Sequence, residues 1–173
     1  SALKLLDLLL FLGLCYFGAY IFERGGRLLI RNTLRAIFGS VVLAIPLVSV
    51  LFALKIPDYY LWPTFIPGFL YIRIYGFSLA LSIAVGIGLL TLPTLQKTGI
   101  RAIIFTGLVV LWTTLFWTSS RGGIYALIMV LPVLAYLMPQ LRTALAPAIL
   151  SFSIGAIISS QIEVPSQIFG FYK

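Results

Sequence analysis

Long apolar runs alternate with short polar segments along the chain. Most runs are close to the roughly 20 residues that a membrane-spanning helix needs. They are continuous rather than alternating between apolar and polar positions, which favours helices over a membrane barrel. The pattern predicts an all-α, polytopic membrane helix bundle with about six transmembrane helices, at residues 5–22, 36–54, 77–95, 102–118, 124–138 and 144–160.

The segment 55–76 interrupts this pattern with three prolines and a dense set of aromatic residues. Prolines at this density disfavour one long helix, and tyrosine and tryptophan favour the headgroup region of a bilayer. We therefore expect an interfacial loop here. Arg73 lies near its end, in the sequence Arg-Ile-Tyr-Gly.

A second interruption, at 119–123, reads Ser-Ser-Arg-Gly-Gly. Its glycines give the backbone the freedom that a tight turn needs, so the sequence predicts a hairpin tip between two membrane helices. Arg121 is the only ionised side chain between residues 102 and 140. An arginine amid so much apolar sequence needs an interface, a cavity or an anionic partner. The hydroxyl of Ser120 can line such a polar pocket.

The composition agrees with a membrane protein, since 61% of the residues are hydrophobic and only 9% are charged. A soluble domain has about a quarter of its residues charged. The net charge of +8 is explained by loop arginines that set topology, and we expect no nucleic-acid partner. The single cysteine, Cys15, suits packing in an apolar run. The chain has no histidine, so we expect neither a metal site nor a cofactor.

Basic residues divide unequally between the two sides of the predicted membrane domain. With six spans, one side holds seven basic residues and one acidic residue. The seven basic residues are Arg24, Arg27, Arg31, Arg35, Lys97, Arg101 and Arg142. Three of these, Arg27, Arg31 and Arg35, recur every four residues, which predicts one face of a short interfacial helix that sets topology and touches anionic lipid. The other side holds five basic residues and three acids, so we expect the first side to be cytoplasmic.

Arg73 and Arg121 then lie together on the outer side, where the topology rule does not account for them. Guanidinium groups match phosphate oxygens and stay charged at physiological pH, so the pair suits an anionic ligand. A lipid-linked phosphate or diphosphate suits this position, because its tail lies in the hydrocarbon and its negatively charged head can bind the arginines. Simpler explanations are that Arg73 reaches to the headgroups and that Arg121 is an ordinary loop charge.

The sequence Ser120-Arg121-Gly122 between two apolar spans resembles the core signature of the O-antigen ligase and polymerase family. Arg73-Ile74-Tyr75-Gly76, followed by a span rich in small residues, resembles that family's upstream arginine–glycine element. The resemblance covers roughly residues 71–138. It implies a metal-independent glycosyltransferase of the bacterial cytoplasmic (inner) membrane that faces the periplasm or cell exterior. Such proteins move a glycan from a polyprenyl diphosphate carrier to an acceptor, either lipid A core or a growing polysaccharide.

The resemblance implies that Arg73 and Arg121, with Ser120, bind the diphosphate of the carrier and that the two arginines stabilise it as the leaving group. The family is longer and has a functional histidine in a large outer loop, so we expect residues 1–173 to be one membrane domain within a larger chain. Asp58 and Glu163 are candidate bases for the acceptor hydroxyl. Two alternatives stay open, a transporter of an anionic or lipid-linked solute and a non-catalytic membrane-assembly subunit.

Overall fold

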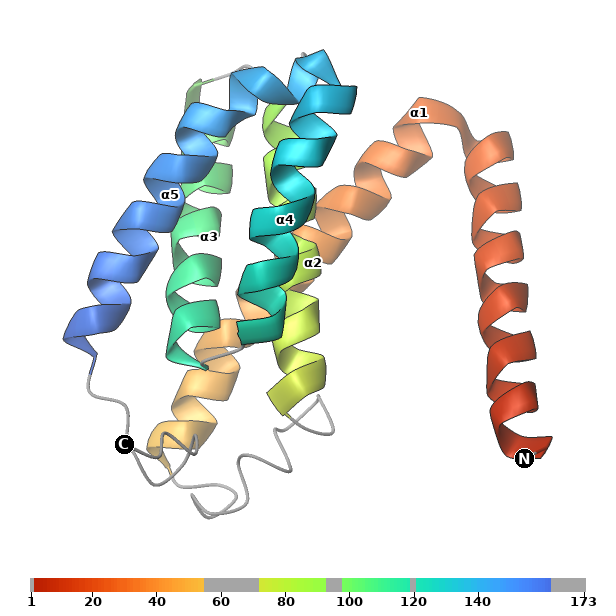
Figure 1. Ribbon diagram of the computed structural model, residues 1–173, viewed down its shortest axis with the longest axis horizontal. Coiled ribbons are helices and arrows are strands. Elements are labelled where there is room, and N and C mark those ends of the chain that lie inside the picture. Colours follow the sequence, from red (N-terminus) through yellow and green to blue (C-terminus); the bar gives the residue numbers. More distant parts are fainter. Residues whose placement is uncertain (1, 55–71, 93–97, 119–120, 163–173) are drawn as a thin grey trace. The chain divides into compact units, whose positions relative to one another are not determined.

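The computed structural model describes residues 2–54, 72–92, 98–118 and 121–162 (Figure 1). In this part of the chain the regular structure is entirely helical, which confirms the predicted all-α class. The elements are α1 (Ala2–Ala53), α2 (Ile72–Leu90), α3 (Thr98–Trp117), α4 (Arg121–Leu137), the short 3-10 helix η3 (Pro139–Leu141) and α5 (Arg142–Gln161).

Three helical stretches are long and apolar enough to cross a membrane: Leu28–Leu51, Thr98–Trp117 and Pro139–Gln161. Ile74–Leu90 and Gly122–Leu137 are apolar but shorter. The structure thus supports a membrane protein, while the number of six spans stays a prediction. The predicted first span, 5–22, lies in the N-terminal part of α1.

The chain forms two compact units, Ser1–Ala36 and Ile37–Lys173. Within the first unit, α1 is interrupted at Gly26, whose backbone is left-handed with φ 61°. Glycine adopts this conformation without the steric cost that a Cβ atom adds. Helix resumes directly after Gly26, so the arginines of 23–35 do not form a separate short helix as predicted. They belong to α1, which also contains Pro46.

The second unit is a bundle in which successive helices run in opposite directions. Helices α2 and α4 begin at the end drawn at the bottom of Figure 1, here called the lower end. Helices α3 and α5 begin at the opposite, upper end. Helix α3 is central, because it packs most extensively against α5 and then against α2, while α4 packs mainly on α2.

Phe38 is inserted between α2 and α3 at two glycines. A Cβ atom on Gly86 would lie 2.5 Å from Cε2 of Phe38, and one on Gly107 would lie 2.7 Å from its Cζ. Phe38 is only 7% exposed. Lipid tails are as apolar as the side chains, so helices in a bilayer associate through close packing at small residues. The two glycines therefore form the space that Phe38 fills.

A second close approach joins α3 and α5. A Cβ atom on Gly155 would lie 2.6 Å from Cβ of Trp112, so the backbones of the two helices nearly touch there. Trp112 is buried and meets Phe152 edge to face, with ring centroids 5.0 Å apart. Phe116 packs against both rings. Aromatic rings prefer such edge-to-face contacts over face-to-face stacking.

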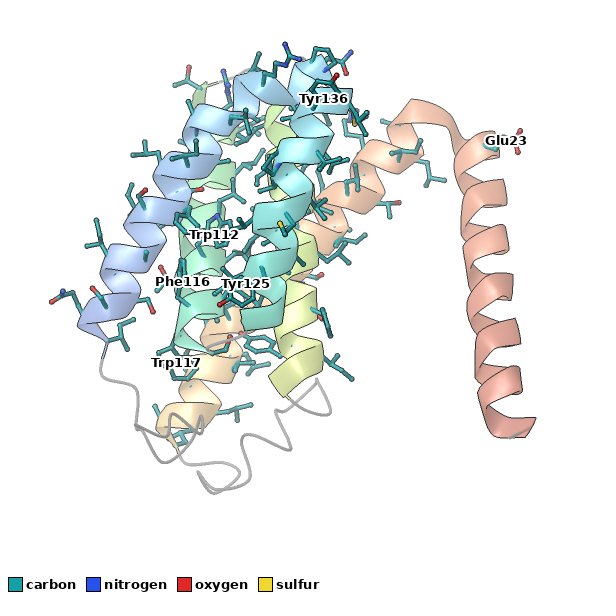
Figure 2. The ribbon with its side chains drawn as sticks, viewed as in Figure 1. Glu23, Trp112, Phe116, Trp117, Tyr125 and Tyr136 are labelled. Atoms are coloured by element: carbon teal, nitrogen blue, oxygen red, sulfur yellow. The ribbon has the colours of Figure 1, made fainter. Side chains whose placement is uncertain are left out.

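Large apolar side chains also cover the outside of the bundle. They include Leu43, Leu47 and Val50 on α1, Ile149 and Ile157 on α5, and Tyr125, Met129, Val133 and Tyr136 on α4 (Figure 2). So many large exposed apolar side chains are unusual on a soluble monomer. They form the surface that a helix bundle exposes to lipid, which agrees with the membrane assignment.

Gly86→Ala is predicted to destabilise the bundle, because the added methyl group would overlap the ring of Phe38. Overpacking of this kind typically costs about 1–3 kcal/mol. Gly88→Ala is the matched control on the same helix, since a Cβ atom there meets nothing within 4 Å. Thermal unfolding of the detergent-solubilised protein measures both. Equal midpoints for the two variants would contradict the Phe38 contact.

Candidate functional site

Arg73 and Arg121 occupy corresponding places on two neighbouring helices. Arg73 is the second residue of α2, and Arg121 is the first residue of α4. Both helices begin at the lower end of the bundle, and α2 packs against α4. For both arginines the structure describes the backbone, and the two backbone positions lie at the same end of the bundle. That their guanidinium groups share one cavity stays a prediction.

The first turns of α2 and α4 meet at glycines. A Cβ atom on Gly123 would lie 3.3 Å from the carbonyl oxygen of Gly76, from Cβ of Ala80 and from Cδ1 of Leu115. Gly76 follows Arg73 by three residues, and Gly123 follows Arg121 by two. This contact between α2 and α4 is therefore within one helical turn of both arginines.

Buried side chains help to hold the first turns of α2 and α4 in place. Tyr75, in the first turn of α2, is 1% exposed. Thr118, just after α3, is 3% exposed and donates a hydrogen bond from its hydroxyl to the carbonyl oxygen of Leu115, at 3.1 Å. Leu115 also contacts Gly123 across the bundle. The starts of α2 and α4 and the end of α3 are thus packed together.

The predicted interruptions end earlier than the sequence suggested. The loop 55–76 gives way to helix at Ile72, and the tip 119–123 gives way to helix at Arg121. Gly122 and Gly123 are therefore helical, and only Gly123 is buried. The physical reason is packing, since a glycine lets α4 approach the backbone of α2. Residues 55–71 and 119–120 lie outside the described part, as do Ser120, Asp58 and Glu163.

The lower end of the bundle carries two helix N-termini, each with a basic residue. The first backbone N–H groups of a helix lack intrahelical acceptors, and the N-terminus carries about half a positive charge. A cation in the first turn is therefore unfavourable by roughly 0.3–1 kcal/mol. Arg73 and Arg121 both occupy such positions, as Arg101 in α3 and Arg142 in α5 do at the upper end. At the lower end, two helix starts in contact, each with an arginine in its first turn, suit an anion.

The upper end shows how an arginine is used for structure instead. Arg142 begins α5 and donates a hydrogen bond from Nε to the carbonyl oxygen of Ala135, at 3.2 Å. Ala135 lies in the last turn of α4, where carbonyl groups lack helical partners and favour a cation. Arg142 thus caps α4. Arg101, in the first turn of α3, is exposed at the same end.

No metal centre is evident in the ranges that the structure describes, which contain no group of three or more His, Cys, Asp or Glu side chains able to hold an ion. Comparison of the chain with protein-family models, with curated proteins and with solved structures finds no match. The candidate site therefore depends on the geometry of the lower end and on the sequence resemblance.

Gly123→Leu is predicted to push the start of α4 away from α2, because the side chain would meet the carbonyl oxygen of Gly76. Spin labels at Phe77→Cys and Tyr125→Cys, both exposed positions near the lower end, report this separation. The distance should increase in Gly123→Leu. Gly122→Leu is the control, since a Cβ atom on Gly122 meets nothing within 4 Å. The same distance in both variants would contradict the Gly76–Gly123 contact.

Proposed function

We propose that this protein is a membrane glycosyltransferase that moves a glycan from a polyprenyl diphosphate carrier to an acceptor at the outer face of the cytoplasmic membrane. One observation supports this proposal most. The starts of α2 and α4, each of which carries an arginine, are in contact through Gly76 and Gly123. The kind of reaction comes from the resemblance to the O-antigen ligase and polymerase family, and the contact between the two helix starts explains why two arginines would act together.

A diphosphate fits this arrangement by charge and by shape. It carries negative charge on two linked phosphoryl groups, so each can accept hydrogen bonds from one guanidinium group. Arginine holds two oxygens at once through its planar fork, which fixes the orientation of the phosphate. The two helix N-termini add a favourable field to the same region.

The length of α4 suits a lipid-linked donor. Its 17 residues give a helix of about 26 Å, slightly less than the roughly 30 Å hydrocarbon core of a bilayer. Arg121, at the first position, then lies close to the hydrocarbon boundary, and its long side chain can reach the lipid phosphates. The polyprenyl tail would run along the apolar exterior of the bundle while the diphosphate stays beside the arginines.

The reaction is a displacement at the anomeric carbon of the first sugar. The acceptor hydroxyl oxygen forms a bond to that carbon, and the bond from the carbon to the diphosphate oxygen breaks. The leaving polyprenyl diphosphate takes the electron pair, and Arg73 and Arg121 stabilise the charge that grows on it. The hydroxyl proton passes to a base, for which Asp58 and Glu163 are the candidates in this sequence.

A transporter of an anionic or lipid-linked solute is the alternative. Transporters place charged groups near the bilayer midplane, at the breaks of discontinuous helices. In this chain Arg73 and Arg121 belong to the starts of α2 and α4 rather than to their middles. That placement favours a site at the membrane surface, as transfer from a carrier to an acceptor requires.

Arg121→Lys is predicted to abolish most glycan transfer, because a lysine keeps the charge but cannot hold two phosphate oxygens in register. Loss of one preorganised donor typically lowers the rate about 100- to 1000-fold. Transfer from a polyprenyl diphosphate glycan, in membranes containing the protein, is the measurement. Near-normal transfer by Arg121→Lys would reject the diphosphate-binding role of this residue.

Arg101→Lys is the control, since Arg101 is exposed at the upper end, and it should transfer normally. The orientation is checked with an impermeant thiol reagent added outside the cell. A cysteine at Ser120 should react and one at Thr98 should not. The reverse pattern would put the arginines on the cytoplasmic side and contradict transfer at the outer face.

A further inference from the structure

Two arginines of α1 lie together without acidic partners. Arg31 and Arg35 are four residues apart, so they share one face of the helix. Arg31 is half-buried, and its Nε is buried with no hydrogen-bond partner among the described residues. Glu23 is the only acidic residue whose side chain the structure describes, and neither arginine forms an ion pair with it.

An anionic ligand would satisfy this arrangement. A buried donor without an acceptor costs about 1–3 kcal/mol, and more for a charged group. Like charges four residues apart on a helix are also unfavourable, and an anion bound between them removes that cost. A phosphate satisfies both requirements, because one phosphate group has oxygens enough to accept from two arginines.

The surroundings of the pair point to a lipid phosphate rather than a soluble one. Leu28 and Ile30 lie beside the arginines and are 59% and 39% exposed. Leu28 also begins the apolar stretch Leu28–Leu51, which is long enough to cross a membrane. Exposed leucine and isoleucine next to arginine is the composition of a helix that enters a bilayer at the headgroup level.

The length of this stretch gives the depth of the arginines. Its 24 residues correspond to about 36 Å of helix, about 6 Å more than a hydrocarbon core of roughly 30 Å. Its other end, Val48–Leu51, carries no charge, so the excess is best accommodated at the end that contains Arg31. Arg31 then lies at the boundary with the headgroups, and Arg35, about one turn further in, reaches the phosphates of the same leaflet by extending its side chain outward.

We propose that Arg31 and Arg35 form a binding site for the headgroup phosphate of an anionic phospholipid. The site retains a lipid through these two side chains, which is more specific than the general attraction of a basic surface for an acidic membrane. It is independent of the diphosphate site on α2 and α4, and it does not depend on the proposed transfer reaction.

The test is native mass spectrometry of the detergent-solubilised protein with added phosphatidylglycerol or phosphatidylcholine. The wild type should retain phosphatidylglycerol in preference to phosphatidylcholine. The double variant Arg31→Gln/Arg35→Gln should bind phosphatidylglycerol roughly 10- to 30-fold more weakly, since each basic residue at an anionic membrane surface contributes about 1 kcal/mol, and 1.4 kcal/mol is tenfold. A wild type without preference for the anionic lipid would overturn the site.

Two further variants separate a site from bulk charge. The variant Lys97→Gln/Arg101→Gln removes the same amount of charge elsewhere, and it should bind phosphatidylglycerol as the wild type does. A loss of binding equal to that of Arg31→Gln/Arg35→Gln would show that only net charge matters and would overturn the proposal. Arg31→Lys/Arg35→Lys keeps the charge but loses the buried Nε donor and the planar fork, so it should bind phosphatidylglycerol more weakly than the wild type. Lysine variants that bind as tightly as the wild type would show that only charge matters and would overturn the proposal. The helical content of each variant, measured by circular dichroism, confirms that the variant is folded.

Discussion

The approach of helix backbones at glycines is the constraint on which the bundle depends. Gly86 and Gly107 admit the ring of Phe38, Gly155 brings α5 onto the backbone of α3 at Trp112, and Gly123 brings α4 onto Gly76. In a bilayer, burial of apolar side chains gives little driving force, because lipid is equally apolar. Helices then associate through contact area, and contact area requires that backbones come close. The last of these contacts also determines the candidate site, since it holds together the two turns that bear Arg73 and Arg121.

The two ends of the bundle use arginine differently. At the upper end Arg142 binds a carbonyl group in the last turn of α4, where a cation is favourable. At the lower end Arg73 and Arg121 lie at helix starts, where a cation is unfavourable. Arg142 also begins a helix, α5, and its hydrogen bond to Ala135 is a compensating interaction. We infer a corresponding compensating interaction for Arg73 and Arg121, which lie on helices in contact. An anionic ligand provides one, and a diphosphate attached to a lipid matches both its charge and its place at the membrane surface.

Much of this arrangement follows from the sequence, and the rest depends on packing. Continuous apolar runs predict helices, and alternation of the helices then places the backbone of Arg73 and of Arg121 at one end, as the structure does. The sequence does not show that Gly123 is a packing residue and Gly122 is not, because the difference arises from contact with α2. It also suggests a hairpin tip where helix begins at Arg121, since glycine signals both turns and close contacts. Whether Ser120, Asp58 and Glu163 contribute stays a prediction.

The central claim is that Arg73 and Arg121 act on one diphosphate. A double-mutant cycle tests it most directly, with binding of polyprenyl diphosphate measured for the wild type, Arg73→Gln, Arg121→Gln and the double variant. If both arginines hold the same ligand, their effects on the binding free energy should be coupled by about 0.5–3 kcal/mol, as is typical of residues in one interaction network. Effects that add to within about 0.5 kcal/mol, or binding that is unchanged in every variant, would contradict a shared site.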